Sequence, residues 1–345
     1  MLILCGFAGS RQPTSPVFMR FFQNLTFGLY GGTIISTTNK SPPHRRREKE
    51  KNMKANEANE KIYAAVTDKI IAQMEAGVIP WKKGWKAISG SYNAKSKRYY
   101  SFINQMILWT KPGAYASFKQ WNELGCKVKK GEKAEFIMEW FSKEVTYTRT
   151  DENGDEEEVK YRKWYPRMYP VFHSSQVEGW TEPESTEIKA ADPIKEAEEL
   201  VEAFKSFSGI KAIITDKESD RAFYNPIRDY IQVPKKEQFS DIAEYYSTLF
   251  HEMTHSTGHS SRLDRGLDKL AAFGDESYSK EELVAELGSA MIMAKLEIDT
   301  PETFMNSAAY LKGWLKALKD DKTLLVSAAS YAEAATRYIF NEKTA

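Results

Sequence analysis

The segment Asp241–Gly258, which reads DIAEYYSTLFHEMTHSTG, decides how the C-terminal half of this 345-residue chain is expected to fold. Asp241 can cap a helix, and Glu244 follows three positions later, as in a capping box. Apolar side chains then recur at helical spacing and form one stripe: Ile242, Tyr245, Tyr246, Leu249 and Met253. We therefore predict a helix that begins after Asp241 and ends near Gly258.

This predicted helix contains the pattern HExxH at His251, Glu252 and His255. Because residues four apart share one face of a helix, the two imidazoles are expected to lie side by side, away from the apolar stripe. Two neutral imidazoles can hold a divalent ion, and a carboxylate beside them can act as the catalytic base for bound water. A polar helix can match the pattern by chance, since only three positions are fixed. A third ligand elsewhere in the chain is therefore needed.

Candidates for the third ligand lie in Ser279–Glu286, SKEELVAE, which opens a second predicted amphipathic helix. Glu282 and Glu286 are one turn apart on one face, which suits a ligand and a second carboxylate that orients a histidine. Glu281 has an alanine one turn later, so it lacks such a partner. Two alternatives remain open, because Glu282 also fits a capping box with Ser279 and Glu286 is itself a candidate ligand.

We predict that one divalent ion is held by three side chains, His251, His255 and Glu282. Zn²⁺ is the expected ion, and another divalent ion such as Mn²⁺ would suit the same donors. The sequence does not single out a group that would stabilise an oxyanion, for which Tyr224 and His259 are candidates.

Aromatic and basic side chains are interleaved at three places in the N-terminal half, residues 80–86, 95–100 and 121–133. Such clusters suit single-stranded nucleic acid, because bases stack on the rings and phosphates meet the cations. Core tryptophans beside surface lysines would produce the same pattern. The candidates for contact with single-stranded DNA are Trp81, Lys82, Lys83, Trp85, Arg98, Tyr99, Trp121, Lys129, Lys130 and Lys133.

Charge is distributed unevenly, although the whole chain carries a formal net charge of only +1. Residues 1–150 are strongly basic and residues 151–345 strongly acidic, so only the first half is expected to meet polyanions. Two cysteines, Cys5 and Cys126, provide no disulfide framework, which favours the reducing cytoplasm. No segment approaches the roughly eighteen apolar residues of a membrane span, and no glycine loop for a nucleotide phosphate is present.

Local patterns divide the chain into four parts. Residues 1–53, with the run His44–Arg47, are expected to be a disordered basic extension, although a basic arm that contacts nucleic acid is the alternative. A helix over 57–77 and strands over 136–172, turning at Asn153-Gly154, belong to the part 54–175. A polar, acidic linker over 176–192 precedes the last part, 193–345, which is expected to begin with a helix over 193–207. Strands near 211–214 and 230–233 would form a small sheet, whose edge can hold an extended peptide.

The run Tyr245–Arg265, YYSTLFHEMTHSTGHSSRLDR, resembles the metallopeptidase domain of ArdC-like antirestriction proteins. Further motifs of that family occur in the expected order: PWKKGW at 80–85, WNELGCKVKKGEK at 121–133, RAFYNP at 221–226, YIQVP at 230–234 and EELVAELG at 281–288. The resemblance covers roughly residues 57–340. It implies an α+β protein of two domains, a small α/β domain that binds single-stranded DNA and a mainly helical zincin-like metallopeptidase domain with a small sheet.

The resemblance also implies a protein carried by plasmids or phages that protects incoming DNA from host restriction. Three functions remain open from the sequence. The first is an antirestriction protein that binds DNA and hydrolyses a protein substrate with its metal. The second is a DNA-shielding protein with a structural or vestigial metal site and no enzymatic activity. The third is a DNA-handling accessory factor, such as a domain associated with a primase.

Overall fold

The computed structural model describes residues 43–77, 79–82, 90–150, 156–182, 192–216, 221–239, 241–267, 276–298 and 308–342. The described residues of Tyr63–Met138 and Met168–Ala345 form one compact unit, called unit 1 here, and those of Phe7–Ile62 and Glu139–Arg167 form unit 2. Helices and small sheets are mixed in one chain, which confirms the predicted α+β class. No helix within the described ranges is both long and apolar enough to cross a membrane.

Unit 1 holds most of the N-terminal elements, which are short. They are η1 (Pro80–Lys82), β1 (Tyr92–Asn93), α2 (Phe102–Leu108), β2 (Ala114–Ala116), α3 (Phe118–Glu123), β3 (Lys127–Val128), η2 (Ser174–Gln176) and β6 (Val177–Glu178). The four-stranded sheet has the order β1-β2-β5-β4, in which β4 spans Glu135–Thr150 and β5 spans Glu156–His173, and β3 pairs separately with β6. A small core between these elements is built around Trp121, with Ala94, Ala114, Ala116, Cys126 and Val177.

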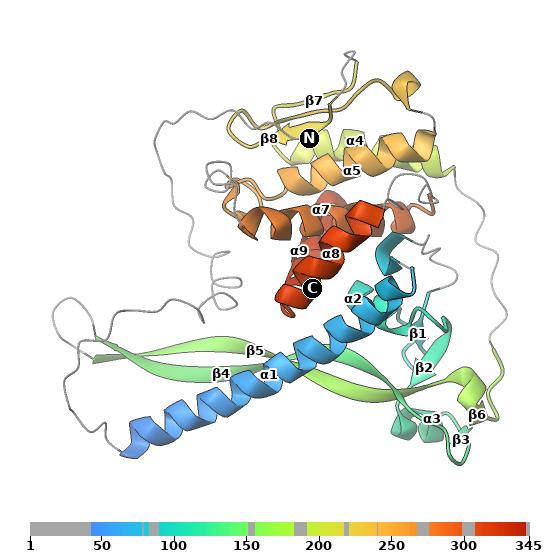
Figure 1. The fold of residues 1–345 in the computed structure, drawn as a ribbon, viewed down its shortest axis with the longest axis vertical. Helices are drawn as coiled ribbons and strands as arrows, with labels where there is room; N and C mark the ends of the chain where they lie inside the picture. Colours follow the sequence, from blue (N-terminus) through green and yellow to red (C-terminus); the bar gives the residue numbers. More distant parts are fainter. Residues whose placement is uncertain are drawn as a thin grey trace. The chain divides into compact units, whose positions relative to one another are not determined.

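Two long strands, β4 (Glu135–Thr150) and β5 (Glu156–His173), run side by side as a ribbon (Figure 1). Strand β4 begins in unit 1 and β5 ends there, whereas residues 139–150 of β4 and 156–167 of β5 belong to unit 2. The strands are those that the sequence predicts, whereas the predicted Asn153-Gly154 turn lies outside the described residues.

The structure corrects two predicted boundaries. Helix α1 spans Pro43–Glu75, so residues 43–53 are helical, and the prediction that they belong to a disordered extension was wrong. Residues 1–42 lie outside the described part of the chain. Val177–Glu178, which we placed in the linker, forms β6 and pairs with Lys127–Val128, so the start of the predicted linker belongs to the fold. The sequence analysis missed this because two-residue strands have no periodic pattern.

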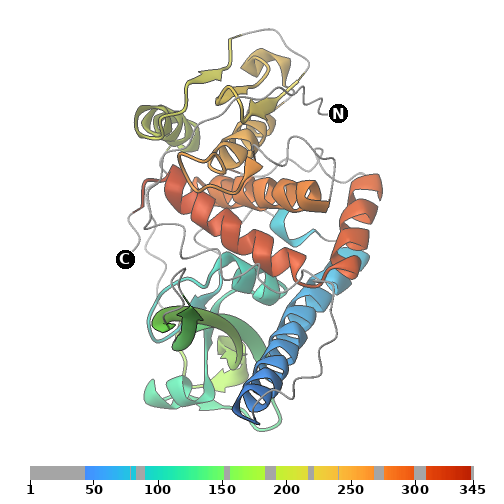
Figure 2. The same cartoon turned by 90° about the vertical axis from the view of Figure 1, so that its left-hand side faces the viewer.

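The C-terminal part of unit 1 is mainly helical, as predicted. It contains α4 (Pro193–Phe207), the sheet strands β7 (Ala212–Ile214), β8 (Phe223–Asn225) and β9 (Tyr230–Gln232), η3 (Lys236–Gln238), and then α5 (Ile242–Ser256), α7 (Glu276–Lys295), α8 (Ala308–Asp320) and α9 (Leu324–Ile339). Helix α7 packs against α5 on one side and α9 on the other (Figure 2). The sheet has the order β7-β9-β8, which leaves β8 at an edge of the described sheet and in contact with α5.

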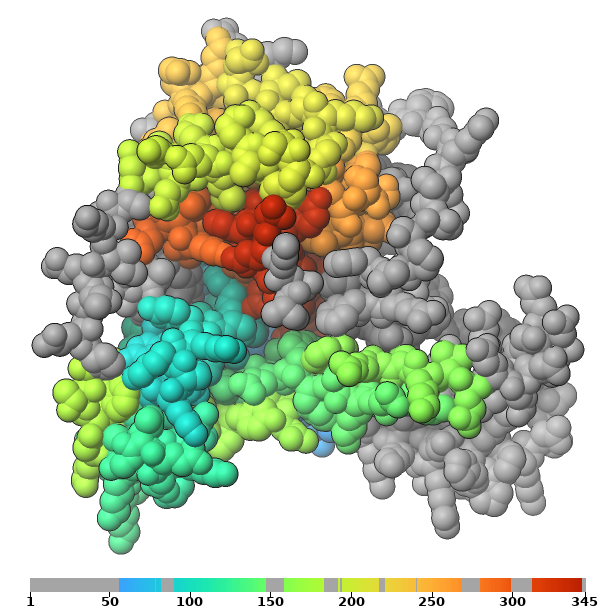
Figure 3. Space-filling model, turned by 180° about the vertical axis from the view of Figure 1, so that it is seen from behind, coloured from blue at the N-terminus to red at the C-terminus, as the bar shows by residue number. Residues whose placement is uncertain are grey.

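One hydrophobic core joins α4, the small sheet, α5 and α7. Phe204 of α4, Ile231 of β9, Phe250 of α5 and Ile292 of α7 are all fully buried in it. The atoms of α4 and the strands after it lie together on one face of unit 1 (Figure 3). Asp241 caps α5 by accepting from the backbone N–H of Ala243 at 2.9 Å, as predicted. The core therefore fixes the helix that carries His251 and His255.

Helices α5 and α7 cross closely at Gly288 and Thr254. A Cβ added at Gly288 would lie 2.5 Å from Cγ2 of Thr254 and 2.7 Å from its Oγ1. Gly258 follows Thr257, the C-cap of α5, so the helix ends where we predicted, and a Cβ at Gly258 would lie 2.7 Å from Leu267. Glycine at position 288 therefore allows α5 and α7 to approach closely.

Gly288→Ala is expected to lower the free energy of unfolding by about 1–3 kcal/mol, since the added methyl overpacks the crossing. Gly313→Ala is the matched control, because this glycine lies within α8 and a Cβ there meets nothing within 4 Å. The control should be neutral or stabilising by up to about 1 kcal/mol. Urea unfolding measures both, and Thr254→Ala combined with Gly288→Ala should recover part of the loss. A Gly288→Ala protein as stable as wild type would contradict the close crossing.

Candidate metal centre

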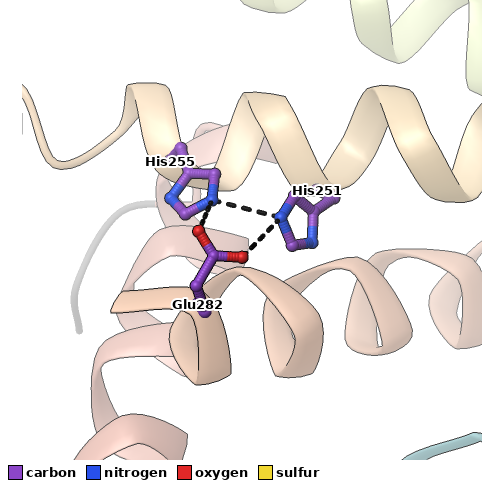
Figure 4. A group of neighbouring side chains, drawn as sticks. All are labelled: His251, His255 and Glu282. Carbon is purple, nitrogen blue, oxygen red and sulfur yellow. Dashed lines mark hydrogen bonds and ion pairs between the residues drawn. The ribbon is translucent and has the colours of Figure 1, made fainter. Parts of the chain in front are cut away.

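Helices α5 and α7 bring three predicted ligands to one place (Figure 4). The Nε2 atoms of His251 and His255 face each other at 3.1 Å, and both belong to α5. Glu282 of α7 points between them, with its Oε2 3.6 Å from Nε2 of His251 and its Oε1 3.5 Å from Nε2 of His255. One donor atom from each residue lies within 4.8 Å of the others. The three side chains therefore converge on one point.

These separations fit a small divalent ion. A tetrahedral ion with bonds of about 2.0–2.1 Å holds its ligand atoms about 3.3–3.4 Å apart. The separation of the two Nε2 atoms, 3.1 Å, and the separation of each Nε2 from one of the two Glu282 oxygens, 3.5 and 3.6 Å, lie close to that spacing. Two imidazoles and one carboxylate are also the donor set of zinc hydrolases that keep a position open for water. The arrangement suits a metal in both geometry and chemistry.

His255 is oriented by a carboxylate that the sequence analysis left without a role. Oε1 of Glu281 lies 3.2 Å from Nδ1 of His255, which leaves Nε2 to face His251 and Glu282. Arg265 holds Glu281 in turn, with Nε and Nη2 donating to the two carboxylate oxygens at 2.9 and 2.6 Å. The same guanidinium donates to the carbonyl of Thr254 at 2.8 Å, so it ties the end of α5 to α7.

Glu286, the residue that we predicted to orient a histidine, lies beside the other ligand. Its Oε1 is 3.9 Å from Nδ1 of His251, which is longer than a hydrogen bond. The prediction for Glu286 thus stays a prediction, whereas Glu281 makes a direct contact with His255. A pattern of two acids one turn apart does not reveal Glu281, because its partner, Arg265, comes from another segment.

The buried side chains around the site shift one another's pKa values. Burial disfavours the charged form of His255, but hydrogen bonds to Glu281 and Glu282 outweigh it and raise its pKa to about 10. Burial opposes the ionised form of Glu282, yet its contacts with the two histidines hold its pKa well below the usual value. The Glu281 carboxyl is also buried, and the Arg265 guanidinium keeps its pKa low. The carboxylates Glu281 and Glu282 are therefore ionised at neutral pH.

Glu252, the predicted base, is buried beside the two histidines with only 4% of its surface exposed. Its Oε2 has no hydrogen-bond partner among the described residues. Burial raises the pKa of this carboxyl, against the opposing effect of His251 and His255 and of a hydrogen bond from the backbone of Tyr224 in β8. A buried acceptor without a partner is rare, and one beside a metal-ligand set is suited to receive a proton.

Both oxyanion candidates have other hydrogen-bond partners in the structure. The Tyr224 hydroxyl is buried and donates to Oδ1 of Asp229 at 2.8 Å, while it accepts from Arg262 at 3.1 Å. His259 is partly exposed after the end of α5, and its Nδ1 lies 2.8 Å from Oγ of Ser261. The Tyr224 ring is instead structural, because Arg262 and Asp229 form a buried ion pair around it.

Glu281→Gln is expected to weaken the binding of Zn²⁺ or Mn²⁺ by about 10–100-fold, the range for groups that orient a metal ligand. Glu286→Gln is the matched control, because the two acids are equally buried, at 8% and 9% exposure. It should have a smaller effect, since its contact with His251 is longer. Calorimetric titration of each variant gives the affinities. Equal affinities for Glu281→Gln and wild type would show that the contact with His255 has no part in holding a metal.

Two families match this chain in the order that its motifs suggest. Residues 60–172 match the N-terminal domain of anti-restriction factor ArdC, and residues 199–331 match a zincin-like metallopeptidase. The crystal structure of antirestriction ArdC protein from the R388 plasmid, in its metal-free form, is 37% identical, with a TM-score of 0.57. The match covers 81% of this chain and 97% of that one.

The chain belongs to the ArdC antirestriction family. The Mn(II)-bound structure of the R388 protein is similar at a TM-score of 0.59 and 35% identity. An uncharacterized protein of Sinorhizobium fredii, y4eC, is 32% identical over 79% of this chain and 89% of its own length. DNA primase TraC of Escherichia coli is 36% identical over 80% of this chain, but the match spans only 27% of TraC.

The ArdC N-terminal segment holds the predicted DNA contacts, and two of them require correction. Trp81 and Trp121 are fully buried, so neither ring is the exposed stacking platform that we predicted. Nε1 of Trp121 donates to the carbonyl of Phe172 at 2.9 Å, and its ring meets Trp180 edge-on at 5.0 Å. A small core needs a large apolar body, and a tryptophan beside lysines in the sequence can serve that purpose.

Some of the other predicted contacts are exposed, and the rest lie outside the residues that the structure describes. Arg98, Lys130 and Lys133 are exposed, Tyr99 is 55% exposed, and Lys129 is exposed while donating to the carbonyl of Ser175 at 2.9 Å. Lys83 and Trp85 lie outside the described residues, as does the side chain of Lys82. The exposed members remain predicted contacts.

One aromatic side chain near Tyr99 was missed because it lies in the predicted linker. Trp180 is half-buried, and Nζ of Lys97 lies 4.6 Å from the centre of its ring. The rings of Tyr92 and Tyr99 meet edge-on with their centres 6.1 Å apart, and Nζ of Lys97 lies 5.9 Å from the centre of the Tyr92 ring. The cluster at residues 95–100 thus includes rings from two other segments, which no local sequence pattern reveals.

Proposed function

We propose that this chain is an antirestriction protein of a mobile element that binds single-stranded DNA and hydrolyses a protein with a divalent metal. Membership of the ArdC family and likeness to a plasmid-borne ArdC protein support the first part. The observation that carries the second part is the convergence of His251, His255 and Glu282 beside the buried Glu252.

The domain organisation that we propose follows the two family matches. Residues 54–175, together with β6 (Val177–Glu178), would bind single-stranded DNA, and 193–345 would form the zincin-like metallopeptidase domain, joined through the residues between them. The matches at 60–172 and 199–331 support this division. The basic charge of the first half and the acidic charge of the second also support it, because only the first half attracts phosphates.

His251, His255 and Glu282 would hold the ion, with Zn²⁺ as the expected metal and Mn²⁺ as the alternative that the R388 structure favours. When bound, such an ion lowers the pKa of a coordinated water and polarises a carbonyl. Glu252 would take a proton on its unpartnered Oε2 and pass it to the leaving amine. Glu281 and Arg265 would keep His255 in the orientation that presents Nε2.

The substrate strand would lie along β8. This strand is at an edge of the described sheet, and it packs against α5, the helix that carries Glu252. An extended peptide can add to such an edge through backbone hydrogen bonds and so be placed beside a catalytic helix. The backbone of Tyr224, in β8, already contacts Glu252, which puts the strand next to the proposed base.

Peptide hydrolysis is tested with a fluorescently labelled unfolded protein, incubated with the full chain and Zn²⁺ or Mn²⁺, with and without single-stranded DNA. We expect cleavage that a chelator stops and that added metal restores. If the metal-loaded protein cleaves nothing under either condition, while a known zinc peptidase cleaves the same probe, the hydrolytic part of the proposal is wrong.

A second candidate function is supported by the similarity to TraC. About a quarter of that primase matches this chain at 36% identity. The chain would then be a DNA-handling factor that accompanies a primase rather than acting on a protein. Stimulation of primer synthesis by a separate primase on single-stranded templates would favour this function, whereas no effect on primer yield would count against it.

A further inference from the structure

One face of the β4–β5 hairpin carries aromatic and basic side chains that no predicted contact includes. Phe141 and Lys143 belong to β4, and Lys163, Tyr165 and Arg167 belong to β5. These five residues are called the hairpin face. All have odd numbers, and alternate residues of a strand point to the same side. Aromatics and cations thus alternate along both strands.

Contacts between the side chains confirm that they share one face. The rings of Phe141 and Tyr165 are stacked across the two strands, with centres 5.5 Å apart and planes at 27°. The guanidinium of Arg167 lies 4.4 Å from the centre of Phe141, and Nζ of Lys143 lies 5.7 Å from it. Nζ of Lys163 lies 5.6 Å from the Tyr165 ring. The five side chains form one continuous cluster.

The rings of the hairpin face are not explained by a hydrophobic core. Phe141 and Tyr165 are only half-buried, and Lys143 and Arg167 are exposed. Among the residues of 139–167 whose side chains the structure describes, Pro166 alone is buried. Among the residues that the structure describes, this part of the ribbon has no core of its own, so the rings add little to its stability, and their accessible position suggests a ligand.

Charge on this face favours a polyanion. Within residues 139–146 and 158–167, strand alternation places one carboxylate, Glu139, on the same side as the three cations, so this part of the face is basic. On the opposite side Lys160 is balanced by Glu144, whose Oε1 lies 3.7 Å from its Nζ. In the sequence, the segment from Asp151 to Glu158 is acidic, so it is not expected to attract phosphates.

We propose that the hairpin face binds single-stranded DNA, with Lys143, Lys163 and Arg167 at phosphates and Phe141 and Tyr165 stacked on bases. Stacked rings edged by cations are the chemistry that single strands require, because duplex bases are hidden in the helix. The proposal rests on the proposed DNA-binding function and adds to it a surface in unit 2. It is separate from the exposed residues near Tyr99.

The full chain tests this with a fluorescent oligothymidylate and a mixed-sequence duplex, whose binding is followed by anisotropy at several salt concentrations. Lys143→Gln/Lys163→Gln is compared with Lys160→Gln/Arg162→Gln, which removes the same charge from the opposite side of the same strands. The first pair should weaken binding at least about tenfold and lower the slope of log affinity against log salt by about 1.4, since each phosphate contact to a single strand contributes about 0.7. The second pair should have little effect.

Removal of the rings isolates the stacking contribution. Phe141→Leu/Tyr165→Leu should weaken binding of the single strand by roughly 5- to 100-fold and leave its salt slope unchanged, because no charge is removed. Far-ultraviolet circular dichroism and metal affinity show whether each variant keeps the wild-type fold. The variant Phe141→Tyr should bind the single strand as wild type does, since it keeps an aromatic ring at this position.

The outcomes separate this inference from the function on which it rests. Wild-type protein that binds no single strand overturns DNA binding itself and the hairpin face with it. If both charge-removing double substitutions weaken wild-type binding equally, the hairpin face alone is overturned, because charge in general would then be sufficient. Equal affinity for duplex and single strand, or no effect of ring removal, overturns the stacking role and leaves a face that attracts polyanions of any kind.

Discussion

His251→Ala is expected to abolish binding of a divalent ion, with a loss of affinity well beyond the roughly 10–100-fold that groups behind a ligand produce. The remaining pair, His255 and Glu282, provides two donors, and two protein ligands rarely hold an ion against water. The same result is expected for His255→Ala. Elemental analysis after gentle purification and calorimetric titration with Zn²⁺ and Mn²⁺ measure the effect.

His259→Ala is the matched control for these variants. His259 lies four residues beyond His255 and completes the helical spacing of the motif, but it contacts Ser261 and is outside the ligand group. Its replacement should leave the affinity for metal unchanged. A loss of binding in His259→Ala equal to that in His251→Ala would mean that the ligand set is a different one.

Glu252→Gln is expected to keep the metal and lose hydrolysis by about 10²–10⁴-fold, the range for removal of a general base. The amide has nearly the same shape but cannot take a proton. Burial raises the pKa of Glu252 in the folded protein, so its ionised form opposes folding at neutral pH. The neutral amide of the Glu252→Gln variant should therefore leave the thermal unfolding temperature unchanged or raise it. Cleavage rates, metal affinity and thermal unfolding are measured on the same preparation.

Glu244→Gln provides the control for Glu252→Gln, since it makes the same chemical change two turns earlier on α5. It should keep full activity. A second measurement, protection of incoming DNA in cells, shows whether hydrolysis is required for antirestriction. If Glu252→Gln protects unmodified DNA from restriction as well as wild type does, hydrolysis is not required for protection, and DNA shielding becomes the better account.

Much of the candidate metal centre could be predicted from sequence, because helical spacing places His251 and His255 on one face of α5. The cap at Asp241, the shared face of His251 and His255, and the turn that carries Glu282 depend on contacts within one helix. Glu281 could not be assigned in this way. Its role depends on Arg265, which lies on another segment and reaches α7 only in the folded chain.

The N-terminal half was harder to predict because its chemistry depends on exposure. Trp81 and Trp121 lie near lysines in the sequence, as residues that stack on bases often do, yet both rings are buried. Phe141 and Tyr165, by contrast, lie in strands that the pattern predicts but that gave no sign of a binding surface. Their significance appears only when the pairing of β4 with β5 brings the two rings together.

The most direct test of the metal centre is an anomalous difference map from crystals of the wild-type protein grown with Zn²⁺ or Mn²⁺. The arrangement of His251, His255 and Glu282 predicts one strong peak, about 2.0–2.2 Å from the two Nε2 atoms and from a carboxylate oxygen of Glu282. A peak at other residues, or none between these three at a saturating concentration of metal, would contradict the account.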